Sequence, residues 1–96
     1  MAEYYNHLIV DIYSNPFEFL DKVDKYALDT QFILDNCYYA DDGSSYEIDG
    51  IEIAKRLHEK GFTRLFLLFG EAFAVPDYLT LILKTDREKI RKLDLL

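Results

Sequence analysis

The chain has 96 residues, half of them apolar and 16% aromatic, which is enough for one hydrophobic core and too apolar for a disordered chain. Its net charge of −7 disfavours nucleic-acid binding, because a phosphate-contacting surface needs a basic patch and the eleven lysines and arginines are dispersed. The single cysteine, Cys37, excludes an intrachain disulfide and a cysteine-based metal cluster. No apolar run approaches the ~20 residues of a membrane span, and Met1–Tyr5 lacks the basic region of a signal peptide. We therefore expect one cytoplasmic domain, residues 1–96, without a membrane partner.

The first third of the chain alternates between strand-like and helix-like patterns. Residues Leu8–Tyr13 are rich in β-branched and aromatic side chains and predict a strand. Asn15 and Pro16 suit the cap and first position of a helix, and Glu18 completes a capping-box spacing. The buried face of this helix is expected to contain Phe19, Leu20, Val23 and Ala27. Gln31–Leu34 then predicts a second strand.

The middle of the chain contains a polar loop and a second helix. The loop, Asn36–Glu47, carries Asp41 and Asp42, and the helix is expected to begin at Asp49 and to end at Gly61. Its apolar face would be formed by Ile51, Ala54 and Leu57.

The last third predicts two strands and a helix. Leu65–Phe69 is a continuous apolar run, which is typical of a strand covered on both faces. Gly70–Pro76 leaves room for about one helical turn. Leu79–Leu83 predicts a fourth strand, and Thr85 caps a final helix lined by Ile90 and Leu93.

This alternation predicts a small α/β domain with a mostly parallel four-stranded sheet, flanking helices and right-handed crossovers. In open α/β sheets, sites are built at the carboxyl edge of the strands. Asp35 follows one apolar strand and Lys84 follows a later one, so both side chains are expected at that edge.

Several short motifs occur in a suggestive order. They are Tyr13, Ser14, Phe19 and Leu20 around the first helix, Asp35 after a strand, Ile48-Asp49-Gly50-Ile51-Glu52 at the second helix start, and Lys84 after the last strand. With these motifs, residues 7–96 resemble the receiver domain of response regulators, the phospho-accepting module of two-component signalling. The resemblance implies a flavodoxin-like, three-layer architecture truncated by one β-α unit. It places Asp35 at the phospho-acceptor position, and Lys84 and Phe69 at the positions that contact the phosphoryl group and relay the switch.

The chain departs from the receiver pattern in four ways. The family's opening unit, a strand ending in two acids followed by a helix, has no room before His7. An alternative alignment makes Leu8–Asp11 that strand and supplies one acid, Asp11. Phe69 stands where the family has Ser or Thr. The loop after Asp35 is longer than usual, and the connection before Lys84 is shorter, which makes the family's fourth helix vestigial.

These departures bear on the chemistry. Phosphoryl transfer to a carboxylate needs its developing charge neutralised, usually by Mg²⁺ and a lysine. The chain retains Asp35 and Lys84 but lacks the acidic pair and the hydroxyl. Asp35, with Asp11 or the loop acids, is therefore expected to hold Mg²⁺ only weakly, and no other cofactor is expected. We interpret Asp35 as a strand-end residue that pairs with Lys84.

The sequence thus predicts a degenerate receiver that serves as a protein-interaction module in signalling, not an enzyme and not phosphorylated. Two alternatives remain: a working phospho-acceptor that uses Asp35, and an unrelated small α/β regulatory protein. The expected partner is a signalling protein such as a histidine kinase, or a second copy. Self-association is expected because the last helix alone would have to shield one sheet face. Tyr38, Tyr39 and Tyr46 in the long loop are expected to be exposed to a partner.

Overall fold

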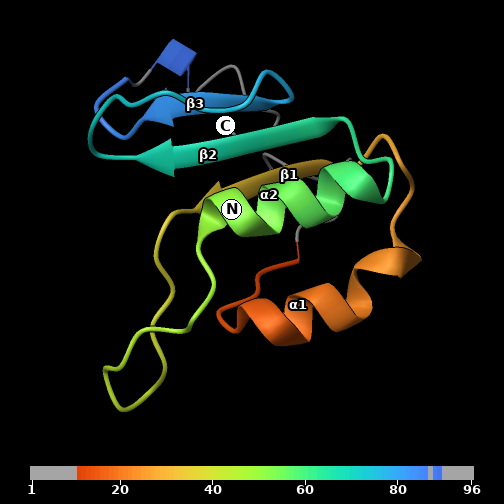
Figure 1. The fold of residues 1–96 in the computed structure, drawn as a ribbon, viewed down its shortest axis with the longest axis vertical. Helices are drawn as coiled ribbons and strands as arrows, with labels where there is room; N and C mark the ends of the chain where they lie inside the picture. The colour runs from red at the N-terminus through yellow and green to blue at the C-terminus, as the bar shows by residue number, and fades with distance from the viewer. Residues whose placement is uncertain (1–10, 87, 90–96) are drawn as a thin grey trace, which may run out of the picture.

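A computed structural model describes residues 11–86, 88 and 89, and Figure 1 shows how their helices and strands are arranged. In chain order these are α1 (Pro16–Lys22), the 3-10 turn η2 (Val23–Lys25), β1 (Gln31–Asp35), α2 (Gly50–Glu59), β2 (Arg64–Phe69) and β3 (Leu79–Leu83). The strands form a parallel sheet in the order β1-β2-β3. The α/β class with a parallel sheet is thus confirmed for three strands and two helices. Among the described residues, none of the helices has the length and apolar character needed to cross a membrane.

The first expected strand is only partly described. Residues 8–10 lie outside the described part of the chain, and residues 11–13 form no strand. The helix that follows begins as predicted, because the Asn15 side chain accepts hydrogen bonds from the N–H groups of Phe17 and Glu18 at 3.0 and 3.3 Å. Ala27 is exposed, contrary to the expectation, because α1 ends at Lys22 and the chain leaves it through η2.

Helix α2 begins at the predicted cap. Asp49 Oδ1 accepts a hydrogen bond from the Glu52 N–H at 2.8 Å. A Cβ atom on Gly50 would lie 2.3 Å from the carbonyl oxygen of Asp35 and 2.5 Å from a methyl group of Leu67, so only glycine fits there. The first turn of α2 therefore packs directly against the carboxyl end of β1.

One face of the sheet packs against both helices. The strand register places Phe32, Leu65 and Leu79 in one row across the sheet. Phe32 contacts Phe19 of α1 with ring centroids 5.7 Å apart, and all four side chains are buried. From α2, this core receives the predicted side chains of Ala54 and Leu57, the partly buried Ile51, and also Ile53, which the predicted apolar face left out.

The opposite face of the sheet differs from the expectation. We expected exposed apolar area there, but Ile33, Phe66 and Leu68 are half-buried and Ile82 is buried. None of α1, η2 and α2 packs on this face. The exposed large apolar side chains of the described residues lie elsewhere: Ile12, Phe17, Leu28, Tyr39 and Phe73.

The connection from β2 to β3 contains no helix, although residues 70–76 leave room for about one helical turn. The segment returns beside α2 instead, where Tyr78 stacks on His58 with ring centroids 4.0 Å apart and planes within 3°. After β3, Asp86 and not Thr85 provides the cap, since its Oδ1 accepts a hydrogen bond from the Lys89 N–H at 3.1 Å. The predicted positions Ile90 and Leu93 lie outside the described residues.

Candidate functional site

The carboxyl edge of the sheet brings together the two residues that the sequence placed there. Asp35 is the last residue of β1, and Lys84 directly follows β3. Lys84 Nζ lies 3.4 Å from Asp35 Oδ1, so the predicted pairing is confirmed. Because β2 separates the two strands, the ion pair spans the end of the central strand. Both side chains are about half exposed to solvent, at 51% for Asp35 and 53% for Lys84.

Asp35 is fixed by two further hydrogen bonds. Its Oδ1 accepts from the Asn36 N–H at 2.9 Å, and its own N–H donates to the Tyr38 hydroxyl oxygen at 2.8 Å. Burial raises the pKa of Tyr38, and the negative charge of Asp35 raises it further against the opposing effect of the donated N–H. Tyr38 therefore holds its proton at neutral pH and ties the loop to the end of β1.

Asp11 lies away from this edge. Its carboxylate accepts a hydrogen bond from the Tyr26 hydroxyl and lies 4.0 Å from Lys25 Nζ. The Tyr26 ring packs on Phe32, near the amino end of β1, with centroids 6.0 Å apart. The pKa of Tyr26 is raised, first by burial and then by the hydrogen bond to Asp11. The structure thus places Asp11 and Asp35 at opposite ends of β1.

Phe69 is the last residue of β2, and its backbone is hydrogen-bonded at the carboxyl edge of the sheet. Its carbonyl accepts a hydrogen bond from the Lys84 N–H at 2.9 Å. Its ring packs edge-to-face on Phe73 with centroids 5.2 Å apart. Because successive side chains of a strand alternate, Phe69 points to the face opposite Leu68, which is in register with Asp35.

The loop acids form turn structure. Asp42 Oδ1 accepts hydrogen bonds from the N–H and the hydroxyl of Ser44 at 2.9 and 2.6 Å, which lowers the pKa of Asp42. Within residues 11–86, 88 and 89, no three His, Cys, Asp or Glu side chains are grouped so that they could hold a metal ion.

The long loop is a folded arm, which we define as residues 36–49. Tyr39 and Ser45 form an antiparallel bridge, and the Tyr46 N–H donates to the Tyr38 carbonyl at 2.9 Å. Figure 1 shows the arm extending beyond the ends of the strands. Tyr39 is exposed as expected, but Tyr46 is half-buried against Phe17, and Tyr38 is half-buried as well.

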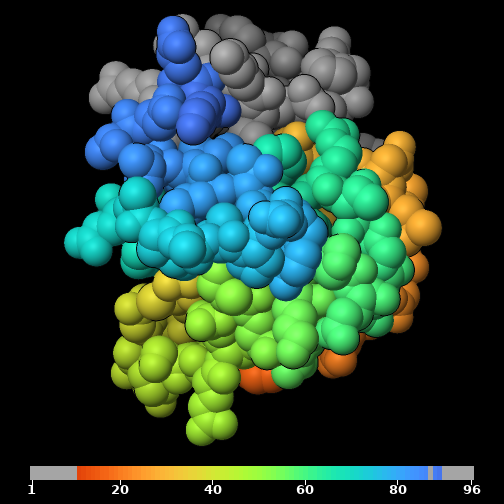
Figure 2. All heavy atoms as spheres, turned by 45° about the horizontal axis from the view of Figure 1, so that its top comes forward, coloured from red at the N-terminus to blue at the C-terminus, as the bar shows by residue number. Residues whose placement is uncertain are grey.

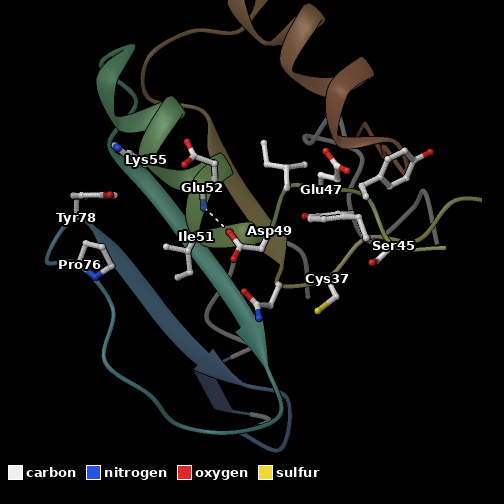
Figure 3. Close-up of a pocket in the computed structure, with 13 residues that line it drawn as sticks. Cys37, Ser45, Glu47, Asp49, Ile51, Glu52, Lys55, Pro76 and Tyr78 are labelled. Atoms are coloured by element: carbon white, nitrogen blue, oxygen red, sulfur yellow. Dashed lines mark hydrogen bonds between the residues drawn. The ribbon is translucent and has the colours of Figure 1, made fainter.

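A hollow of about 700 Å³ opens between this arm, α2 and the segment that precedes β3. Figure 3 shows Glu47 and Cys37 on the arm side, Glu52 and Lys55 on α2, and Tyr78 across from the arm. In Figure 2 the cyan segment 70–78 and the yellow and lime arm are both visible on one face of the molecule. Of this segment, Pro76 and Tyr78 line the hollow.

No protein-family model matches the chain, and neither a curated protein nor a solved structure matches it. The functional proposal therefore depends on the sequence pattern and the geometry.

Sequence reasoning did not find the hollow. The arm and α2 are consecutive in the chain, but the third wall comes from a distant segment, in which Pro76 and Tyr78 carry no motif. The one available signal was the lack of helical periodicity in residues 70–76, which is compatible with an extended segment.

Proposed function

We propose that this chain is a degenerate, receiver-like module that binds other proteins in signalling, and that its Asp35–Lys84 pair has a structural role. The ion pair itself carries the proposal. Lys84 Nζ lies 3.4 Å from Asp35 Oδ1, which also accepts the Asn36 N–H. A carboxylate and a lysine at the carboxyl edge of a parallel sheet support the relation to receivers. The ammonium group of Lys84 offsets the negative charge of the Asp35 carboxylate and joins the two strand ends.

The position of Asp11 supports the absence of phosphoryl transfer. Mg²⁺ at such a site is held by one or two carboxylates with waters and phosphate oxygens. Asp11 is the acid that the alternative alignment supplies, and it is bound to Tyr26 instead. Within the described residues, Asp35 also belongs to no group of three His, Cys, Asp or Glu side chains that could hold the ion.

The same proposal includes a fourth strand in the sheet. A strand from Leu8 would pair with the side of β1 that faces away from β2 and complete a four-stranded, flavodoxin-like sheet that lacks one β-α unit. Asp35 would then end an internal strand, as in receivers. NMR cross-peaks between the amide protons of residues 8–10 and 31–35 would support this order. Their absence in a folded sample would favour an unrelated small α/β regulatory protein.

The proposed partner is a cytoplasmic signalling protein, such as a histidine kinase, or a second copy of the chain. Light scattering coupled to size-exclusion chromatography tests self-association directly. A mass of one chain at high micromolar concentration would exclude the homo-oligomer and leave the heterologous partner.

A titration with beryllofluoride and Mg²⁺ tests the structural role of the ion pair. Beryllofluoride mimics a phosphoryl group on a carboxylate. The expected result is an unchanged amide spectrum at residues 34–36 and 83–85. Shifts confined to these residues, and lost in Asp35→Asn, would identify a working phospho-acceptor and overturn the proposal.

A further inference from the structure

The hollow beside α2 has one apolar side. Ile51, Pro76 and Tyr78 line it there. Tyr78 is held in place by its parallel stack on His58, with ring centroids 4.0 Å apart. A ring fixed in this way offers an ordered apolar and π surface at little entropic cost to a ligand.

The other side of the hollow is acidic. Three carboxylates, those of Glu47, Asp49 and Glu52, line it together with one ammonium group, that of Lys55. Within the described part of the chain, no ion pair or side-chain hydrogen bond engages Glu47. Glu52 is neutralised only by an exposed contact with Arg56 at 3.3 Å. The lining therefore repels anions and attracts a cation.

The base of the hollow is preorganised. The Gly50 N–H donates to the Asn36 carbonyl at 3.0 Å, which closes the arm at the start of α2. Asp49 Oδ1 is committed to the helix cap at 2.8 Å from the Glu52 nitrogen. The backbone that carries these carboxylates is thus fixed by a helix start and a closed arm.

Size and chemistry together define the occupant. A volume of about 700 Å³ lies in the range of ligand sites, and the hollow is open along one side. An arginine guanidinium can stack on a tyrosine ring and donate paired hydrogen bonds to a carboxylate. An apolar side chain next to it would cover Ile51 and Pro76.

We propose that this hollow docks a basic segment of a partner protein, with an arginine between Tyr78 and the carboxylates and an apolar neighbour on Ile51. This inference names the partner chemistry of the proposed interaction module and depends on that function. The two proposals are tested separately, because the beryllofluoride titration probes Asp35 and does not probe the hollow.

The experiment is an amide NMR titration of the full chain with a capped hexapeptide that contains two arginines and a leucine. Two matched peptides replace arginine with citrulline, which keeps the shape without the charge, or with glutamate. The expected result is saturable shifts at residues 47–55 and 76–78 with the arginine peptide. Binding should weaken about tenfold with citrulline, which corresponds to the loss of one strong charged contact.

Two charge-neutralising variants make the titration specific. Glu47→Gln removes a carboxylate of the hollow, and Asp41→Asn removes one from the arm outside it. We expect Glu47→Gln to weaken binding severalfold and Asp41→Asn to leave it unchanged. Equal effects of the two variants, shifts spread over the whole acidic surface, or no shifts at millimolar peptide would overturn the inference. Concentration-dependent shifts at the hollow without peptide would assign it to a second copy and overturn it as well.

Discussion

The ammonium group of Lys84 reaches the carboxylate of Asp35 across the end of a strand that lies between theirs. The two atoms are 3.4 Å apart, and each side chain is about half exposed. Neighbouring strands lie about 4.8 Å apart, so the two backbones are separated by roughly twice that distance. The long side chain of Lys84 closes most of this gap and joins the outer strands of the described sheet.

Replacing either member of this pair should change stability only slightly. Exposed ion pairs typically contribute about 0.2–1 kcal/mol, because solvent screens the charges and ordering the side chains costs entropy. A double-mutant cycle with Asp35→Asn and Lys84→Met, measured by urea unfolding, should give a coupling free energy in this range. A coupling above about 2 kcal/mol would mean that the pair is better desolvated than its exposure indicates.

Gly50→Ala should destabilise the fold strongly. The added methyl group would meet the Asp35 carbonyl at 2.3 Å, so α2 would have to move away from β1. Overpacking of this kind costs about 1–3 kcal/mol or more, and we expect the upper end. The matched control is Gly70→Ala, because no atom lies within 4 Å of the position that its added methyl group would take. Urea midpoints that fall equally for both variants would contradict the close seating of the helix.

The fold should lose stability in alkali partly through Tyr38. Its pKa is raised, chiefly by burial, so the folded chain keeps a proton that the unfolded chain loses above about pH 10. This contribution is fully present below the ordinary tyrosine pKa and is lost as the pH rises through the raised value. The measurement is the free energy of unfolding in urea, taken at neutral and at alkaline pH for the same protein, so that each protein provides its own reference.

Two phenylalanine variants isolate this effect. Tyr38→Phe should reduce the alkaline loss of stability, whereas Tyr39→Phe, at a side chain that is 63% exposed, should leave it unchanged. An identical alkaline loss in both variants would place the effect at other groups. The raised pKa of Tyr26 predicts a residual decline in either case.

The contribution of both predicted helix caps to the stability of the fold should be measurable. Asn15→Ala and Asp49→Ala each remove a side chain that accepts hydrogen bonds at a helix start, and each should cost about 1 kcal/mol. The conservative changes Asn15→Asp and Asp49→Asn retain the acceptor and should restore most of the stability. Thermal unfolding followed by circular dichroism provides the comparison, and failure of the conservative variants to recover would indicate a role other than capping.

Local rules explain which parts of this molecule were predictable. The caps Asn15 and Asp49 depend only on nearby backbone N–H groups, so short patterns were sufficient. The meeting of Asp35 and Lys84 follows from parallel strands ending at a common edge. The stacking of Tyr78 on His58 joins two distant segments, and no local pattern encodes such a contact. The hollow could not be predicted for the same reason.

The arm begins and ends at one point of the fold, because the Gly50 N–H is bonded to the Asn36 carbonyl. Its tip, residues 39–45, can therefore change in length or composition while the sheet and α2 keep their positions, since loop closure entropy grows only slowly with length. A chain built this way can acquire a new binding preference by exchanging a few surface residues. The tip is accordingly the natural place to graft foreign recognition sequences onto this small scaffold.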